Sequence, residues 1–357
     1  DGEKIEKLQN LAEIFIFTGP DLLSVVNSDE IVITLLGCFR NSDNNDVLDF
    51  SSTSMVNFID TFNPRPSIFL SNDAVPLFAE KFDKGLNQSA MGNCIKILKF
   101  LVDEEPQMIG KQFGVLRLLK VFDTLRLADQ RSSMYCIAAM YGYNITAEIA
   151  KYIPRLCMML NATDKFLQSK AVSALAKMVP AMAEDAYDQA MMAPLQEFIN
   201  TENNTSSLDS ILNVMKDASK RVNFAQLVIN SSFDFSRIFS ERYMKNKELT
   251  NKVLNLLLNI FPPAEFPSGF WDKPHPLANG LKEYSEKIIK YTLPFFQITS
   301  GNENLFLALL CVCQKLSPFD YQPEIFTKVS TILQELSSTP FVLLFSLTAD
   351  QKYDPLI

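Results

Sequence analysis

The sequence predicts an all-α fold in which helical repeats stack side by side into a right-handed superhelical solenoid. Glycine supplies only 11 of the 357 residues, which is few for a chain rich in tight turns. No segment alternates apolar and polar residues for long enough to predict a strand. Similar apolar segments recur at a nearly constant spacing, and a chain of this length can grow as a repeat array without enlarging a single core.

Four short apolar openings mark the repeat. They surround Pro76, Val115, Pro154 and Pro194, which lie 39, 39 and 40 residues apart. A polar break and a second, longer apolar segment follow each of the first three openings, so each unit is predicted to be a helical hairpin. The longer segments read SAMGNCIKILKFLV, RSSMYCIAAMYGY and FLQSKAVSALAKMV.

The prolines indicate which kind of helical repeat this is. A proline in the first turn of a helix is tolerated because its missing N–H would have no partner within the helix. We therefore expect Pro76, Pro154 and Pro194 near the starts of the second helices of three units, each after a short first helix. A period near 40 is typical of armadillo or HEAT arrays, and the short first helix favours armadillo, whereas the tetratricopeptide unit of about 34 residues is too short.

Less regular units flank this series. An earlier hairpin is predicted from Asp29 to Phe62, around a polar loop at 41–46. A looser unit follows a polar break at 200–207. Both polar segments are expected to be loops between helices.

Three regions follow from these patterns. Residues 1–240 are assigned about five to six armadillo-like repeats, and 241–276 a helix plus a proline-rich loop, at 262–276, that holds the only Trp and the only His. Residues 277–357 are predicted to form a helical extension or cap of the solenoid. Because the sequence begins at Asp1 without an initiator Met, we expect it to be part of a longer chain.

Charge and cysteine usage narrow the classes of partner. The net charge of −8 argues against nucleic acid or an anionic membrane surface, because both are bound through clustered Lys and Arg. The longest apolar runs are much shorter than the roughly 20 residues that a membrane span requires. All six cysteines lie in apolar helical segments, which favours a reducing, intracellular compartment, either the cytoplasm or the nucleus.

Residues for catalysis are not evident in the sequence. The single histidine, His275, lies between two prolines and far in sequence from every cysteine, so no nucleophile and base are expected to pair. Only Cys311 and Cys313 are close enough in sequence to suggest a zinc site, and on a helix they would point to different faces. The glycine-rich loops GxxxxGK and GxGxxG are missing. We therefore expect no catalytic residue, metal or cofactor in this chain.

The last helix of each unit is expected to line a groove, and its exposed positions are the candidate protein-binding residues. Aligning the four clearest units places Ala138 and Gly142, one turn apart, among two rows of groove positions. Tyrosines near this helix would supply contact area at low entropic cost, although they could instead pack against the neighbouring unit. The candidates are Asn57, Thr61, Asn93, Lys96, Phe100, Tyr135, Tyr141, Lys170, Ser173 and Lys177. Importin-alpha repeats resemble this register but carry Trp and Asn at the two rows, a pair that none of these units has, so a nuclear-import receptor is not predicted.

Four segments carry a resemblance to a known family. They are AVPLFAEKF from Ala74, GVLRLLKVFD from Gly114, QRSSMYCIAAMYGYNITAE from Gln130, and YIPRLCMMLNATDKFLQSKAVSALAKMV from Tyr152. In this order they resemble the N-terminal armadillo region of HECT-type E3 ubiquitin ligases of the ubiquitin-fusion-degradation and thyroid-receptor-interacting group. The resemblance covers about two thirds of the chain, and the junction from the NIT motif to IPRL is its most specific part.

This resemblance implies a function in substrate recognition. The armadillo region would bind protein substrates, and ubiquitin or ubiquitin chains already attached to them, close to a HECT catalytic domain that this sequence lacks. Polyubiquitination and degradation by the proteasome, a further expected partner, would follow. The alternative is a generic armadillo or HEAT scaffold or transport adaptor that is unrelated to ubiquitin.

Overall fold

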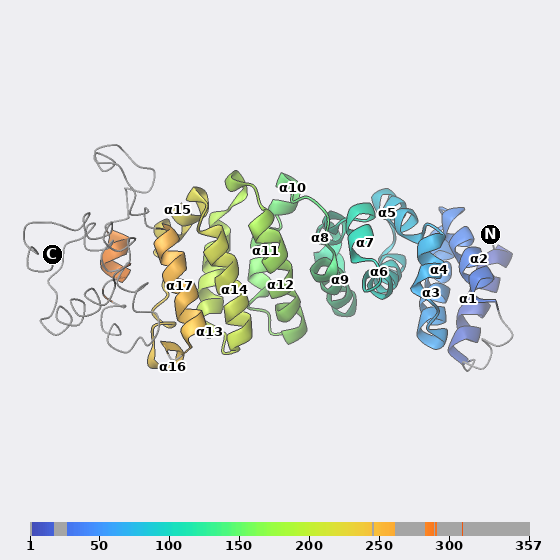
Figure 1. The fold of residues 1–357 in the computed structure, drawn as a ribbon. Helices are drawn as coiled ribbons and strands as arrows, with labels where there is room; N and C mark the ends of the chain where they lie inside the picture. Colours follow the sequence, from blue (N-terminus) through green and yellow to red (C-terminus); the bar gives the residue numbers. More distant parts are fainter. Residues whose placement is uncertain are drawn as a thin grey trace, which may run out of the picture. The chain divides into compact units, whose positions relative to one another are not determined.

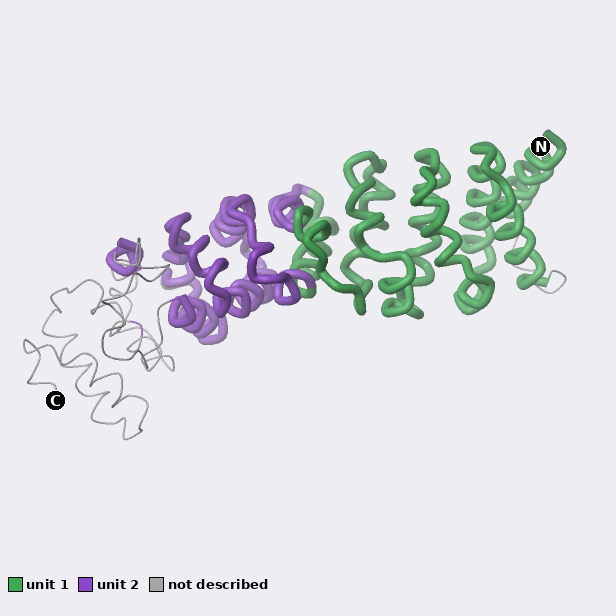
Figure 2. Tube along the Cα trace, turned by 90° about the horizontal axis from the view of Figure 1, so that it is seen from above, with its two compact units in different colours: residues 1–152, 164–177 green, residues 153–163, 178–357 purple. Residues whose placement is uncertain are grey.

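The computed structural model describes residues 2–17, 27–244, 246–260, 283–288, 290 and 309. These residues form helices and connecting loops, and no strand occurs in this part of the chain (Figure 1). The chain divides into two compact units (Figure 2). Unit 1 comprises Asp1–Tyr152 and Asp164–Lys177, and unit 2 comprises Ile153–Thr163 and Met178–Ile357.

Unit 1 contains an N-terminal helix followed by helical repeats. The N-terminal helix is α1 (Gly2–Phe17), and the first repeat is the hairpin α2 (Ser28–Arg40) and α3 (Asn45–Phe62). Two three-helix repeats follow: α4 (Pro66–Ser71), α5 (Ala74–Lys84) and α6 (Gln88–Val102), then α7 (Pro106–Gln112), α8 (Val115–Val121) and α9 (Leu127–Ala139). The unit also contains α10 (Ala147–Ala150) and all but the last residue of α12 (Lys165–Met178).

The prolines lie where the sequence predicts them. Pro76 is the third residue of α5, Pro154 the second of α11 (Ile153–Met159) and Pro194 the third of α13 (Met192–Thr201). A short helix precedes each of them along the chain, namely α4, α10 and a 3-10 turn at Gln189–Met191. The predicted order of a short first helix, a second helix and a longer last helix is therefore confirmed, and with it the armadillo-like repeat and the all-α fold class.

Asparagine side chains set the start of several helices. The Oδ1 atom of Asn44 accepts hydrogen bonds from the backbone N–H groups of Asp46, at 2.9 Å, and Val47, at 3.4 Å. These bonds satisfy donors that have no partner within the helix, so α3 begins at Asn45. The predicted polar loop at 41–46 was therefore too long, because its last residues belong to the first turn of α3.

The last helix of each repeat, which we call the inner helix, packs beside the inner helix of the next repeat. In unit 1, α3 packs along α6, and α6 packs along α9. Helix α1 packs along α3 in the same way, so it takes the place of an inner helix from a preceding repeat. The sequence pattern placed α1 in the repeat region but did not predict this role.

Aromatic rings connect successive repeats in the core of unit 1. The ring centroids of Phe15 and Phe58 lie 5.3 Å apart, and those of Phe82 and Phe113 lie 5.0 Å apart, which joins α1 to α3 and α5 to the end of α7. Burying one such side chain contributes about 1.5–3 kcal/mol. Because part of each ring is covered by a neighbouring repeat, the repeats depend on one another for their cores.

Unit 2 continues with α11, α13 and a second group of helices. These are α14 (Thr205–Ala218), α15 (Val222–Asn230), α16 (Glu241–Met244) and α17 (Lys247–Ile260). The inner helices α14 and α17 pack side by side. Asn204 caps α14 as Asn44 caps α3, so the predicted break at 200–207 shortens to 202–204.

Several predictions fall on residues that the structure does not describe. The proline-rich loop at 262–276, with His275, and the cysteines Cys311 and Cys313 lie outside the described residues, as does most of the predicted cap at 277–357. The three predicted regions and the handedness of the superhelix stay predictions. Within the described helices, none combines the length and the apolar character that a membrane span needs.

Candidate functional site

The inner helices α3, α6, α9 and α12 form one face of unit 1, which we call the inner-helix face. Contacts between α9 and α12 extend this face beyond the α3, α6 and α9 stack. The Nε atom of Arg131 donates to Oδ2 of Asp164 at 2.7 Å, and Nζ of Lys177 donates to the carbonyl oxygens of Ala138 and, at 3.0 Å, Ala139. The predicted binding residues, except Tyr141, lie on these four helices.

The two candidates on α3 already contact α1. The Nδ2 atom of Asn57 donates to the carbonyl oxygen of Ala12 at 3.0 Å, and the hydroxyl of Thr61 donates to the carbonyl of Phe15 at 2.7 Å. Both side chains are half-buried. Their donor groups therefore hold α1 in place, and are not free to contact a partner.

Thr61 belongs to a recurring cap. It is the penultimate residue of α3, Lys177 is the penultimate residue of α12, and Asn259 is the penultimate residue of α17. Each donates to a carbonyl in the last turn of a preceding inner helix: Phe15 of α1, Ala138 and Ala139 of α9, and Lys216 of α14. Last-turn carbonyls have no partner within their own helix, so these side chains complete helix ends across the repeat boundary.

Asn93 also has a structural contact. It is 9% exposed, and its Nδ2 atom donates to the hydroxyl oxygens of Ser52, at 3.2 Å, and Thr53, at 2.9 Å, on α3. This candidate therefore ties α6 to α3 inside the stack.

Tyr135 on α9 lies at the centre of the most distinctive group on the face. The ammonium nitrogen of Lys170, from α12, lies 4.6 Å from the centroid of its ring, and that of Lys99, from α6, lies 5.5 Å away. The same Lys170 nitrogen lies 5.5 Å from the ring centroid of Phe166, which is 38% exposed. We call Lys99, Tyr135, Phe166 and Lys170 the Tyr135 cluster. Sequence analysis found Tyr135 and Lys170 but missed Lys99 and Phe166.

The hydroxyl of Tyr135 is fixed by Asp103. It donates to Oδ1 of that residue at 2.6 Å. The hydrogen bond to the Asp103 carboxylate, helped by burial, raises the pKa of Tyr135 to about 12. The phenol therefore stays protonated to a higher pH than a free tyrosine does.

The other candidates on α6 and α12 differ in exposure and in the groups that they contact. Lys96 is exposed, and its ammonium lies 3.9 Å from Oδ1 of Asp129, which is an ion-pair distance but too long for a hydrogen bond. Phe100 is half-buried, with its ring 6.2 Å from that of Phe69. Ser173 is exposed and bonds its own helix. Lys177 has a lowered pKa, chiefly because it is desolvated.

Tyr141 and Gly142 do not lie on an inner helix. Helix α9 ends at Ala139, so Gly142, which was aligned one turn beyond Ala138, falls in the following loop. Its positive φ of 81° permits this turn, and a Cβ atom there would lie 2.8 Å from the Gln107 side chain of α7. The predicted place of Gly142 on the inner helix is therefore wrong. Tyr141 is 49% exposed in the same loop.

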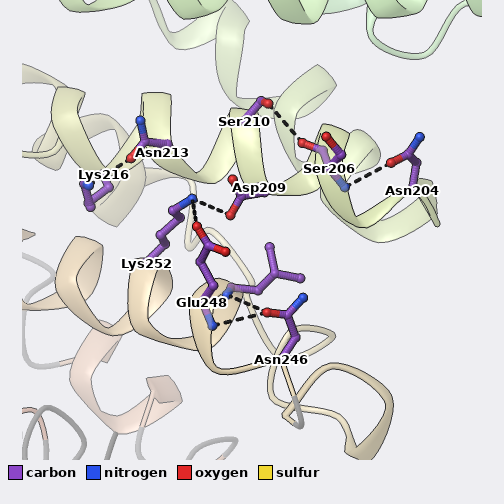
Figure 3. Close-up of polar contacts among 10 residues, drawn as sticks. Asn204, Ser206, Asp209, Ser210, Asn213, Lys216, Asn246, Glu248 and Lys252 are labelled. Carbon is purple, nitrogen blue, oxygen red and sulfur yellow. Dashed lines mark hydrogen bonds and ion pairs between the residues drawn. The ribbon is translucent and has the colours of Figure 1, made fainter.

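The inner helices of unit 2 carry a different polar group (Figure 3). Nζ of Lys252, on α17, donates to Asp209 of α14 and lies 3.3 Å from Oε1 of Glu248. The Lys252 side chain is 15% exposed and has carboxylate partners on both helices. This group therefore joins α14 to α17. It differs from the Tyr135 cluster, in which the lysines contact rings.

Metal ligands and reactive thiols were both expected to be missing, and the described residues bear on each in a limited way. Among them, no group of three or more His, Cys, Asp or Glu side chains could hold a metal ion. Burial raises the pKa of the Cys94 and Cys136 thiols above the usual range and that of Cys157 to about 12. These thiols therefore stay protonated and act as core residues.

Comparison with known proteins informs the fold. No family model matches the sequence, and no curated protein matches it. The crystal structure of an engineered protein from the Northeast Structural Genomics Consortium aligns with a TM-score of 0.51 and 14% identity, over 96% of this chain and 93% of that chain. A designed armadillo repeat protein aligns with a TM-score of 0.44 and 13% identity, over 60% of this chain and 92% of that chain.

A third structure is a designed armadillo repeat protein in complex with the peptide (KR)4. It aligns with a TM-score of 0.42 and 12% identity, over 60% of this chain and 91% of that chain. At these identities the comparisons bear on fold alone. The resemblance to HECT-type ligases therefore rests on the sequence segments quoted for it.

Proposed function

We propose that this chain is a protein-binding scaffold, which holds a peptide segment of its partner on the inner-helix face of unit 1 and carries out no catalysis itself. The observation that supports this best is the Tyr135 cluster. It combines two partly exposed aromatic rings with two ammonium groups, and these come from three successive inner helices. Aromatic residues are enriched at protein interfaces, and tyrosine is among the residues that dominate binding energy there.

The sequence resemblance supports a more specific role. In this proposal the chain is the substrate-recruiting region of a HECT-type E3 ubiquitin ligase, and it binds protein substrates and ubiquitin or ubiquitin chains in the cytoplasm or nucleus, where degradation by the proteasome follows. Its physical contribution would be proximity, because a tethered substrate meets the catalytic domain at a high effective concentration. A generic scaffold with no link to ubiquitin is the alternative.

A binding titration tests both levels of the proposal. The purified chain would be titrated by calorimetry with monoubiquitin, ubiquitin chains and a linear ubiquitin fusion protein. Binding of a ubiquitin form that is lost in Tyr135→Ala supports the ligase role on this face. If no ubiquitin form binds, the ligase role is contradicted.

The scaffold role is tested separately by selecting peptides from a random display library on the wild-type chain. Peptides that bind and that lose affinity in Tyr135→Ala support it. If no selected peptide depends on Tyr135, the inner-helix face of unit 1 is not the binding site.

A further inference from the structure

The ammonium groups of Lys99 and Lys170 have different neighbours from those of Lys84 and Lys120 in unit 1. Lys84 and Lys120 each lie within 3 Å of a carboxylate oxygen, at 2.7 Å from Glu80 and 2.8 Å from Glu148. In the described part of the chain, Lys99 and Lys170 have aromatic rings as neighbours but no hydrogen-bond acceptor or carboxylate partner. A ring attracts a cation but accepts none of the three ammonium N–H donors as strongly as an anion would. Both lysines therefore retain donors for a ligand.

The acidic side chains close to the Tyr135 cluster already accept hydrogen bonds from other residues. Asp103 accepts the Tyr135 hydroxyl, and Asp164 accepts from Arg131 and caps α12 through the N–H of Phe166 at 2.9 Å. The Arg131 guanidinium, together with the backbone bonds, holds the pKa of Asp164 below its usual value. Hydrogen bonds therefore hold the Asp103 carboxylate on Tyr135 and the Asp164 carboxylate on Arg131.

Charge is distributed unevenly along the face. Helices α6, α9 and α12 together carry six cationic residues, Lys96, Lys99, Arg131, Lys165, Lys170 and Lys177, against one acidic residue, Asp129, with Asp103 at the end of α6 and Asp164 at the start of α12. The neighbouring inner helix α3 carries three acidic residues, Asp46, Asp49 and Asp60, and no cation. The surface formed by α6, α9 and α12 is thus locally basic in a chain whose net charge is −8.

The size of this basic surface limits the length of its ligand. Adjacent packed helices lie about 10 Å apart, so three inner helices span ~20 Å, which an extended peptide crosses in about six residues. A longer polyanion such as a nucleic acid would meet the aspartates of α3 and the overall negative charge of the chain. A short acidic segment of a protein satisfies both limits.

From these observations we infer that the inner-helix face of unit 1 selects an acidic peptide segment, with its carboxylates on Lys99 and Lys170 and its backbone or apolar side chains on the rings of Tyr135 and Phe166. The inference rests on the proposed scaffold function and specifies the chemistry of the partner. Ammonium–carboxylate contacts give the specificity, and the rings supply apolar contact area.

The test uses the full chain and a display library of random peptides, about twelve residues long, which exceeds the span of the three helices. Selection is carried out on the wild type, on Lys99→Gln/Lys170→Gln, and on the matched control Lys84→Gln/Lys111→Gln, which removes the same charge from α5 and α7, neither of which is an inner helix. Asp and Glu should be enriched in peptides selected on the wild type and the control, and this enrichment should be lost on Lys99→Gln/Lys170→Gln.

Affinity gives a second measure. A fluorescent peptide of alternating Glu and Ala should bind the wild type and the control equally, and should lose about tenfold or more in affinity on Lys99→Gln/Lys170→Gln, as expected for loss of a hydrogen bond to a charged group. The corresponding Gln–Ala peptide should bind weakly to all three proteins. Equal affinity of the Glu–Ala peptide for all three would overturn the inference.

The outcomes separate the two proposals. Peptides that are neutral or basic, but that lose affinity in Tyr135→Ala, contradict the acidic specificity and leave the scaffold function standing. If no peptide depends on Tyr135, both fail. A short single-stranded DNA that binds more tightly than the Glu–Ala peptide, and that depends on Lys99 and Lys170, contradicts a peptide as the ligand.

Discussion

The backbone carbonyl oxygen of Tyr141 occupies the space beside Gly110 of α7 where any other residue would begin its side chain. A Cβ atom at Gly110 would lie 2.2 Å from that oxygen, much closer than van der Waals contact allows. The loop that follows α9 is therefore held against α7. Tyr141 is anchored by this contact to a helix outside the inner-helix face.

Replacing this glycine tests the contact. Gly110→Ala should lower the free energy of unfolding by about 1–3 kcal/mol, because the obstructing atom is backbone and the loop must shift. Gly37→Ala is the matched control, since Gly37 lies within α2 and a Cβ there meets no atom within 4 Å. The control should be neutral or stabilising by up to about 1 kcal/mol, through higher helix propensity. Urea denaturation of both variants measures the difference, and equal stabilities would contradict the close packing.

Thr61 is expected to secure the end of α1. Thr61→Val keeps the shape of the side chain but removes the hydrogen bond to the carbonyl of Phe15, which should cost about 1 kcal/mol locally. Hydrogen exchange of the α1 amides should accelerate about fivefold, while exchange in α6 and α9 stays unchanged. Ser173→Ala, at an exposed position, should leave α1 exchange as in the wild type. Unchanged hydrogen exchange of α1 in Thr61→Val would show that this hydrogen bond does not stabilise the end of α1.

The contribution of Tyr135 to the stability of the folded chain should decrease at alkaline pH. Its pKa is about 12 in the folded chain against a usual value of 10.0, so the unfolded chain loses this proton first as pH rises. The contribution is fully present below pH 10 and is lost as pH rises to about 12. The free energy of unfolding of the wild type, minus that of Tyr135→Phe, should be constant below pH 10. It should decrease as the pH rises from 10 to about 12.

Asp103→Asn checks the cause of that pKa. It removes the charged acceptor of the Tyr135 hydroxyl, so the tyrosine should titrate closer to its usual value. Ultraviolet difference spectra of this variant and the wild type, each compared with its Tyr135→Phe derivative, isolate the one phenol. An unshifted titration in Asp103→Asn would assign the raised pKa to burial.

Lys252 should be important for the contact between α14 and α17. Lys252→Gln leaves the carboxylates of Asp209 and Glu248 without their shared cation, and should destabilise the chain by about 1–3 kcal/mol. Lys220→Gln, which disrupts an exposed pair with Asp217, should change stability by less than about 0.5 kcal/mol. Adding Asp209→Asn to Lys252→Gln should recover part of the loss. The absence of any recovery would contradict a direct interaction between Lys252 and Asp209.

Much of the fold could be predicted because its determinants are local. A proline in the first turn of a helix and a spacing near 40 are properties of the sequence itself, and Pro76, Pro154 and Pro194 lie at the predicted helix starts. Polar residues after Asn44 were assigned to a loop because composition alone does not separate a loop from a capped first turn.

The candidate site could be predicted only in part. Aligning repeats gives the face of a helix but not where the helix ends, so Gly142 was placed on a helix that stops at Ala139. The same alignment treated Thr61 and Lys177 as groove residues, although both cap a neighbouring helix. Lys99 was missed because its neighbour, Tyr135, comes from a different repeat, and Phe166 joins the cluster only through its contact with Lys170. The sequence signal that could have identified the cluster was the presence of lysines and aromatic residues on consecutive inner helices.

The penultimate caps point in one direction along the chain. Phe15 receives its hydrogen bond from Thr61, Ala139 from Lys177, and Lys216 from Asn259, so the donor in each of these pairs comes later in the sequence than the acceptor. During synthesis on the ribosome, an inner helix capped in this way emerges before the residue that completes its end. Its last turn therefore stays hydrated and frayed until the capping helix has been made, and a nascent chain arrested between the two would expose an unfinished helix terminus to chaperones.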